Sequence, residues 1–324
     1  MTSLLKKKRC RPGLLGIEKL GIIYAVATAL TALLFRSEMP ELPQMLATRA
    51  AFLAGIAVLA AVYRRRACHL TFFLRILLQM AMLAVWYPET YLFCRLFGNY
   101  DHVFAMVDQH IFGCQPALLF SEKLGGPVWC ELFNLGYFSY YPMIAFLVIW
   151  TFMRRYLLFE KTTFIVMCSF FIFYAVFMFL PVAGPQFYYQ AIGLDAARAG
   201  TFPQIELYFQ NHFDMIDPPA GGALFQWLVE AAQKSGERPT AAFPSSHVGI
   251  SSIIMILAWK ADRHRRVFLG LLPFYTLLCF STVYIHAHYA IDAIAGLLVA
   301  WPVYRISHAI YYTRTFHRPR GYHS

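Results

Sequence analysis

Charged side chains are scarce in this sequence. Of its 324 residues, 14% are Asp, Glu, Lys or Arg, whereas 59% are hydrophobic and 17% are aromatic. A soluble domain typically carries about 25% charged residues, and one core in a chain of this length could not bury so much apolar side chain. This scarcity excludes a soluble globular protein, a disordered chain and a small disulfide scaffold. We therefore expect an all-α, polytopic transmembrane helix bundle.

Other features are also missing. No CxxC pair occurs among the seven cysteines, which argues against a structural zinc site. No small-residue cleavage site follows the basic residues Lys6–Arg9, so we interpret the apolar run after them as a span and not as a signal peptide. Cys94, Cys114 and Cys130 lie on or near the predicted external side, where one disulfide could form, with Cys94–Cys114 the preferred pair.

Eight apolar runs approach the roughly 20 residues that a helix needs to cross the hydrocarbon layer. The first two runs are short, so this hairpin could be tilted or partly interfacial. The predicted spans are Leu20–Phe35, Ala50–Tyr63, Leu70–Phe93, Trp129–Met153, Thr162–Pro181, Phe243–Trp259, Val267–Ile285 and Asp292–Tyr312.

The basic residues are distributed unevenly between the loops. Most Lys and Arg lie at the amino terminus, in Arg64–His69, Arg154–Lys161 and Lys260–Arg266, and in the carboxyl tail. Alternating spans put these segments on one side, and positive loops stay cytoplasmic. We expect both termini in the cytoplasm, in a bacterial inner membrane rather than a Golgi-type one. The net charge of +11 is then a topology signal, and no nucleic-acid partner is expected.

Loops around 36–49, 94–128 and 182–242 then lie on the external side. Within them, His102–Phe112 has an amphipathic pattern and ends at Gly113 and Pro116, which predicts an interfacial helix. Residues 186–242 could form a cap over an external site or a mobile connection without function; both interpretations stay open.

Ionisable residues gather at two places near the membrane boundary. The first, Ala242–His247, precedes the sixth span, and the second, Tyr284–Asp292, joins the seventh span to the eighth. Because the sixth span runs inward and the seventh returns, both segments lie on the external face. We therefore expect His247 and His288 to be neighbours in space.

This combination of residues favours phosphoryl transfer. Ser245 or Ser246 can cap the helix start, whose free N–H groups form an anion site. Asp292, four residues after His288, can hold one ring N–H and leave the other nitrogen as a nucleophile. His247 can protonate a leaving oxygen. The scheme requires no metal or other cofactor. The alternative is that each segment is only a helix cap or a polar residue at a wet boundary.

At these positions the sequence resembles the membrane-embedded type-2 phosphatidic acid phosphatase superfamily. Pro244–His247 matches its PSxH motif, and His288 with Asp292 matches its HxxxD motif. The resemblance implies that His288 is the nucleophile, Asp292 its orienting partner and His247 the general acid. Two departures exist: Thr282 replaces the phosphate-binding arginine of the SRxxxxxH motif, and the KxxxxxxRP motif is missing.

The inositol phosphorylceramide synthase branch shares these omissions, and Ser281–Tyr284 and Asp108 are similar to its landmarks. The resemblance covers mainly residues 94–305 and implies a six-helix phosphatase-like core. It divides the chain into N-terminal transmembrane helices, residues 1–93, and a catalytic part, residues 94–324, with an external cap at 186–242. Members of that branch move a phospho-headgroup from a glycerophospholipid to a ceramide-type alcohol.

Further residues are candidates for binding the substrate. Glu131, Asn134 and Tyr137 recur at helical spacing and form a polar stripe on the fourth span, with Tyr284 and His286 in the second motif. A protonated His286 could replace the missing arginine. The alternative for the stripe is bonding to neighbouring helices.

These features together predict a lipid phosphotransferase that forms a phosphohistidine. It would move an inositol phosphate-like headgroup from a glycerophospholipid to a ceramide-type alcohol, at a site facing periplasm or lumen. Its partners would be the two lipid substrates and the bilayer, and the oligomeric state stays open. One alternative is a lipid phosphate or polyprenyl pyrophosphate phosphatase with water as acceptor. Another is a non-catalytic lipid transporter or scaffold.

Overall fold

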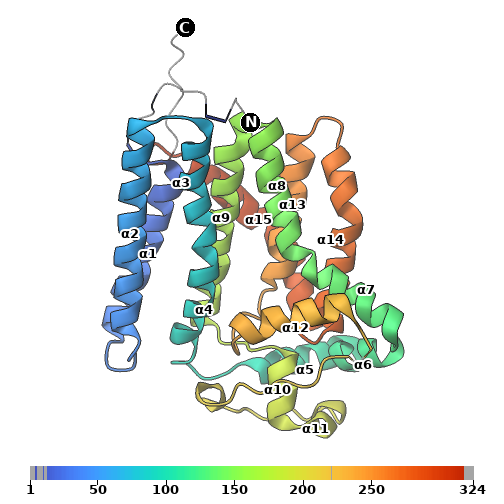
Figure 1. Ribbon diagram of the computed structural model, residues 1–324. Helices are drawn as coiled ribbons and strands as arrows, with labels where there is room; N and C mark the ends of the chain where they lie inside the picture. The colour runs from blue at the N-terminus through green and yellow to red at the C-terminus, as the bar shows by residue number, and fades with distance from the viewer. Residues whose placement is uncertain (1–3, 6–9, 11–12, 220, 317–324) are drawn as a thin grey trace. The chain divides into compact units, whose positions relative to one another are not determined.

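The computed structural model describes residues 4–5, 10, 13–219 and 221–316. This described part is all-helical and contains no strand, which confirms the predicted fold class (Figure 1). The chain divides into two compact units. One comprises Met1–Trp86, Thr151–Phe171 and Tyr304–Ser324, and the other comprises Tyr87–Trp150 and Ile172–Val303.

Apolar helices of spanning length confirm a multi-pass membrane protein. Among the described residues, six helical stretches are long and apolar enough to cross a membrane: α1 (Gly16–Leu34), α2 (Leu42–Arg65), α3 with α4 (His69–Ala81 and Leu83–Cys94), α9 (Tyr156–Phe179), α14 (Arg266–Tyr284) and α15 (Ala290–Tyr311). The predicted fourth span is a pair, α7 (Pro127–Phe138) and α8 (Tyr140–Arg154), bent by 40°. The predicted sixth span is α13 (Ser246–Ala261), a shorter apolar helix of 16 residues.

The first two helices are longer than the sequence suggested. Helix α1 has 19 residues and α2 has 24, so the expectation of a short hairpin was wrong. Helix α2 begins at Leu42 because Pro43 suits the first turn of a helix. It continues to Arg65 because Arg64 and Arg65 complement the negative end of the helix dipole.

A buried ion pair joins α1 to α3 within the first unit. Arg75 Nε donates to Glu18 Oε1 at 2.7 Å, and Arg75 Nη2 donates to Glu18 Oε2 at 2.5 Å. Glu18 Oε2 also accepts a hydrogen bond from Leu15 N at 2.8 Å, at the start of α1. Both charged side chains are almost fully buried. The pair therefore fixes the start of α1 against α3.

Short helices gather at one end of the second unit, the end at which α13 begins and α14 ends (Figure 1). Helix α5 (Asp101–Phe112) confirms the predicted amphipathic helix, and it stops at Gly113, whose φ of 69° suits a helix C-terminus. Helix α6 (Pro116–Lys123) follows. The segment 186–242 contains most of α10 (Pro185–Ile192), α11 (Leu194–Arg198), a 3-10 turn (Tyr208–Gln210) and α12 (Leu224–Gly236).

All seven cysteines are free, so the expected Cys94–Cys114 disulfide is not formed. Cys94 is buried at the end of α4, whereas Cys114 is half-buried in the turn after α5. Cys130, the third external cysteine, has its Sγ donating to Pro219 O at 3.0 Å.

Candidate active site

The first turns of α13 and α15 are joined through their backbones. Ser245 caps α13, because its Oγ accepts a hydrogen bond from Val248 N at 3.3 Å. Ser245 N donates to Asp292 O at 3.0 Å. The two helices can approach this closely because residue 296 is glycine, where a Cβ atom would lie 2.5 Å from Ser245 O. The two motif segments are therefore neighbours, as predicted.

His247 and His288 face each other at this junction. His288 Nε2 lies 3.4 Å from His247 Nδ1, and the ring centroids are 5.6 Å apart. His288 is 3% exposed, and burial lowers its pKa to about 4. The His288 ring is therefore neutral at pH 7, which is the form in which a ring nitrogen can act as a nucleophile.

A backbone carbonyl sets the tautomer of His288. Nδ1 lies 2.8 Å from Ala242 O, which can only accept, so Nδ1 carries the proton and Nε2 keeps its lone pair. The hydrogen bond expected from His288 to Asp292 is not formed. Asp292 Oδ2 is 3.8 Å from Nδ1 and accepts from Tyr289 N at 2.9 Å. The reason is that α15 begins only at Ala290, so the two residues do not share a helical face.

Two aspartates on α5 brace the loop that carries His288. Asp108 accepts hydrogen bonds from Ala290 N at 2.8 Å and Ile291 N at 3.0 Å, the first two N–H groups of α15. Asp101 accepts from the hydroxyl of Tyr289 at 2.9 Å and from two backbone N–H groups of the turn before α10. Burial raises the pKa of Asp101, and it raises the pKa of Asp108 to about 6.

From the sequence, Asp101 was not identified as a site residue, and Asp108 was identified only through the family resemblance. Their spacing of seven residues, which places both on one face of an amphipathic helix, was the available signal.

Aromatic rings enclose His247. The ring of Tyr137 stacks on it, with centroids 4.5 Å apart and an interplanar angle of 25°. The ring of Tyr140 lies 4.3 Å from it on centroids. Tyr137 therefore lies at the site, as predicted, whereas Tyr140 was not predicted. Ser246, the first residue of α13, is also buried there.

The sequence that forms this site has a counterpart among known families. The sequence model of the PAP2 superfamily matches residues 109–306, which is more than half of the chain and includes both histidines and Asp292. The chain belongs to the PAP2 superfamily. Comparisons with curated proteins and with solved structures gave no match. PAP2 members are phosphatases or phosphotransferases, so the chain belongs to a family of membrane enzymes that process lipid phosphates.

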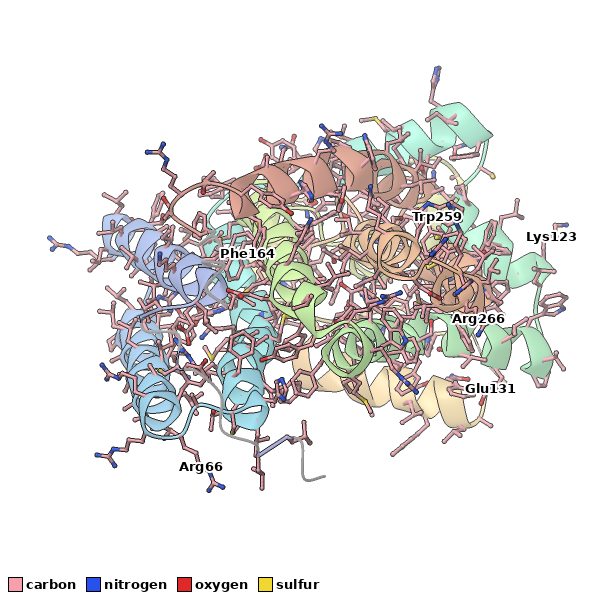
Figure 2. The ribbon with its side chains drawn as sticks, turned by 90° about the horizontal axis from the view of Figure 1, so that it is seen from above. Arg66, Lys123, Glu131, Phe164, Trp259 and Arg266 are labelled. Carbon is pink, nitrogen blue, oxygen red and sulfur yellow. The ribbon has the colours of Figure 1, made fainter. Side chains whose placement is uncertain are left out.

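Three residues that the sequence predicts to bind the substrate have hydrogen-bond partners within this PAP2 protein. Glu131 accepts hydrogen bonds from Ala223 N and Phe225 N, both at 2.8 Å, and so caps the start of α12 (Figure 2). Asn134 Nδ2 donates to the carbonyl oxygen of residue 130, one turn earlier on α7. The Tyr284 hydroxyl donates to the carbonyl oxygen of residue 124. Within the stripe, Glu131 therefore bonds to a neighbouring helix, Asn134 bonds within its own helix, and Tyr137 stacks on His247.

His286 does not replace the missing arginine. Its Nε2 is hydrogen-bonded to Ser121 Oγ at 2.9 Å, and burial lowers its pKa to about 4. It is therefore uncharged near neutral pH and supplies no cation for a phosphate.

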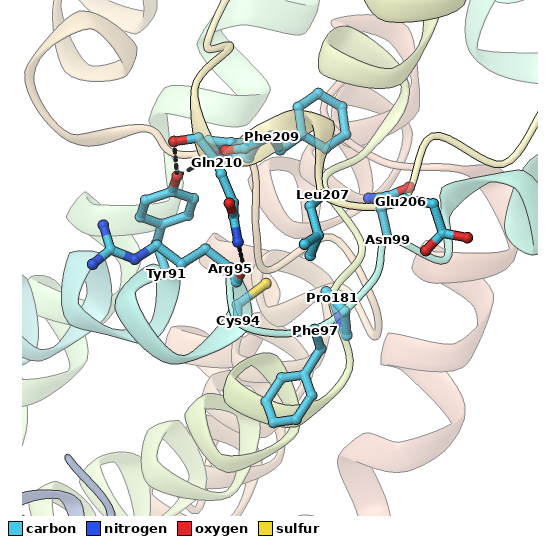
Figure 3. Close-up of a pocket in the computed structure, with 11 residues that line it drawn as sticks. Tyr91, Cys94, Arg95, Phe97, Asn99, Pro181, Glu206, Leu207, Phe209 and Gln210 are labelled. Atoms are coloured by element: carbon cyan, nitrogen blue, oxygen red, sulfur yellow. Dashed lines mark hydrogen bonds between the residues drawn. The ribbon is translucent and has the colours of Figure 1, made fainter. Parts of the chain in front are cut away.

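A separate small pocket lies between the end of α4 and the turn around Leu207 (Figure 3). Cys94, Pro181, Leu207 and Phe209 are among its lining residues, and neither histidine is. Its cavity volume of about 10 Å³ is enough for roughly one water molecule. This pocket is therefore too small for a lipid headgroup, and the histidine pair remains the candidate site of this PAP2 protein.

Proposed function

We propose that this PAP2 protein is a lipid phosphotransferase with His288 as nucleophile and His247 as general acid and base. It moves a phospho-headgroup of the inositol phosphate kind from a glycerophospholipid to a ceramide-type alcohol. The observation that carries the proposal is the orientation of His288, whose proton is held at Nδ1 by Ala242 O while Nε2 faces the second imidazole.

The reaction takes two displacements. In the first, the Nε2 lone pair of His288 attacks phosphorus, the bond from phosphorus to the glyceride oxygen breaks, and that oxygen takes a proton from the imidazolium form of His247. In the second, the acceptor hydroxyl gives its proton to neutral His247 and attacks phosphorus. The phosphorus–nitrogen bond then breaks and releases His288. Backbone N–H groups in the first turn of α13 supply an anion site for the phosphate.

The charges around the histidines support a phosphodiester donor. In the described part of the chain, the groups that shift the pKa of His288, Asp101 and Asp108 are backbone amides, an asparagine and a tyrosine, with no Lys or Arg among them. A phosphate monoester approaches two negative charges at neutral pH, because its second pKa is about 6. A phosphodiester keeps one charge, and so needs less compensation from the neutral groups that surround these side chains.

The proposed topology puts this site on the external face, with both termini in the cytoplasm. The uneven distribution of Lys and Arg between loops supports this orientation.

The decisive experiment supplies purified protein in vesicles with phosphatidylinositol and a labelled ceramide. We expect labelled ceramide carrying the inositol phosphate headgroup with the wild type, and none with His288→Ala or His247→Ala. His212→Ala is the matched control, because His212 is an exposed histidine whose ring stacks on Tyr208. Its product yield should equal that of the wild type.

Other outcomes would contradict the proposal. Release of free phosphate from lipid phosphates without any labelled lipid product would make the protein a phosphatase that uses water. Full activity in a folded His288→Ala protein would remove both enzyme functions and favour a transporter or scaffold. Loss of activity in EDTA would contradict a reaction carried by imidazoles alone.

A further inference from the structure

A group of linked polar side chains lies in the segment between α9 and α13. Gln186 Nε2 donates to Glu237 Oε1 at 3.0 Å, and Gln233 Nε2 donates to Gln186 Oε1 at 3.2 Å. Gln186 is buried, whereas Gln233 and Glu237 are half-buried. These three residues, here called the amide–carboxylate group, belong to neither histidine motif.

The amide–carboxylate group is connected to both halves of the candidate site. Gln186 N donates to His286 O at 2.9 Å, within the second motif. The Glu237 carboxylate interacts electrostatically with the hydroxyl group of Tyr137, whose ring stacks on His247. The group therefore contacts the second motif and lies within electrostatic range of the tyrosine that stacks on His247.

The chemistry of this group is that of a hydrogen-bond acceptor. Burial raises the pKa of Glu237 to about 7, against the hydrogen bond from Gln186, which lowers it. The carboxylate also interacts electrostatically with the hydroxyl groups of Tyr87 and Tyr141. Arg238, the next residue, points elsewhere: its guanidinium lies over the Phe213 ring, 5.9 Å from the centroid. A carboxylate in such surroundings gains from a donor supplied by a ligand.

We propose that Glu237 recognises the headgroup of the donor lipid by accepting a hydrogen bond from its hydroxyl or ammonium group, while Gln186 and Gln233 hold the carboxylate in position. This inference rests on the proposed function, since it takes the reacting phosphate to lie at His288. Hydroxyl and ammonium groups share the required chemistry because both donate to a carboxylate. A choline headgroup has no N–H or O–H and gains nothing from Glu237.

The test compares Glu237→Gln with the wild type on vesicles of phosphatidylinositol, phosphatidylethanolamine or phosphatidylcholine. Glutamine keeps the shape and one acceptor oxygen but removes the charge. If phosphatidylinositol is the natural donor, we expect its KM to rise about tenfold, because a hydroxyl hydrogen bond is weakened. If phosphatidylethanolamine is the natural donor, we expect its KM to rise about 100-fold, because an ion pair is lost. KM for phosphatidylcholine should stay unchanged. Glu230→Gln is the matched control, because Glu230 is a half-buried carboxylate on α12 that accepts from Gln226.

A binding measurement separates this inference from the proposed function. Equilibrium binding of the same three lipids to detergent-solubilised His288→Ala, with and without Glu237→Gln, needs no turnover. A preference for donor-bearing headgroups that disappears only with Glu237→Gln supports the inference, even if no acceptor lipid is ever labelled. An equal effect of Glu237→Gln on all three lipids, or no effect on any, overturns it. Unchanged melting temperatures would show that each variant is folded.

Discussion

Gly296→Ala should separate the two histidines without removing either. The added Cβ would lie 2.5 Å from Ser245 O and 3.3 Å from Gly249 N. Both are backbone atoms, so no side chain can rotate away. The oxygen of Ser245 must withdraw by about 0.9 Å to reach an ordinary 3.4 Å contact, and Ser245 is two residues from His247.

The size of the effect follows from this displacement. A misplacement of about 1 Å at reacting groups costs about 100-fold in rate, whereas overpacking costs about 1–3 kcal/mol in stability. We therefore expect kcat/KM for headgroup transfer to fall about 100-fold in a protein that still folds. The assay is headgroup transfer in vesicles, with the melting temperature measured in parallel.

Gly270→Ala provides the matched control. Gly270 lies within α14, and a Cβ there would meet no atom within 4 Å. Alanine favours helix over glycine by about 1 kcal/mol, so this variant should be fully active and no less stable. If Gly296→Ala kept kcat/KM within about twofold of the wild type, the close approach of α15 to Ser245 would not position the histidines, and the expected sensitivity of the rate to their geometry would be refuted.

Three further predictions concern carboxylates. Asp108→Asn leaves one acceptor oxygen for the N–H groups of Ala290 and Ile291. It should therefore lower the free energy of unfolding by about 1–3 kcal/mol and reduce kcat. Thermal melting and transfer assays would measure the two effects. Glu18→Gln leaves Arg75 buried without its counter-charge, so it should cost about 3–5 kcal/mol while sparing activity per folded molecule; an active-fraction assay would check this. Because the pKa of Glu237 is about 7, its charge is lost as pH falls from 8 to 6. KM for the preferred donor should therefore rise over that range, and Glu237→Gln should show a flat profile.

The fold and the place of the site could be predicted because both depend on local patterns. Long apolar runs identify spans, and the basic loops order them in the membrane. Once the sixth and seventh spans are antiparallel, His247 and His288 must meet at one face. The length of α2 was underestimated because its ends are set by Pro43 and two arginines rather than by hydropathy.

The partners within the site could not be predicted because they come from distant segments. Ala242 O is 46 residues from His288, and the Asp108 brace is 182 residues from Ala290. Every residue has a backbone carbonyl oxygen, so the sequence does not indicate which one will bind His288. Asp292, four residues away, was therefore predicted as the partner of the His288 ring. Glu131 fitted a polar stripe on α7, but that pattern does not reveal that α12 packs there and needs a cap.

The two braces also constrain what the site can bind. Asp101 and Asp108 each satisfy several donors of the loops around His288, which a neutral asparagine could do only in part. These two carboxylates also place negative charge beside the proposed phosphate site. Asp292 lies within electrostatic range of both. A substrate with one charge is repelled less than a substrate with two. Under the proposed function, the carboxylates that hold His288 in place also disfavour a doubly charged donor. Replacing Asp108 with asparagine should therefore increase the relative rate on phosphate monoesters, even as it slows the reaction overall.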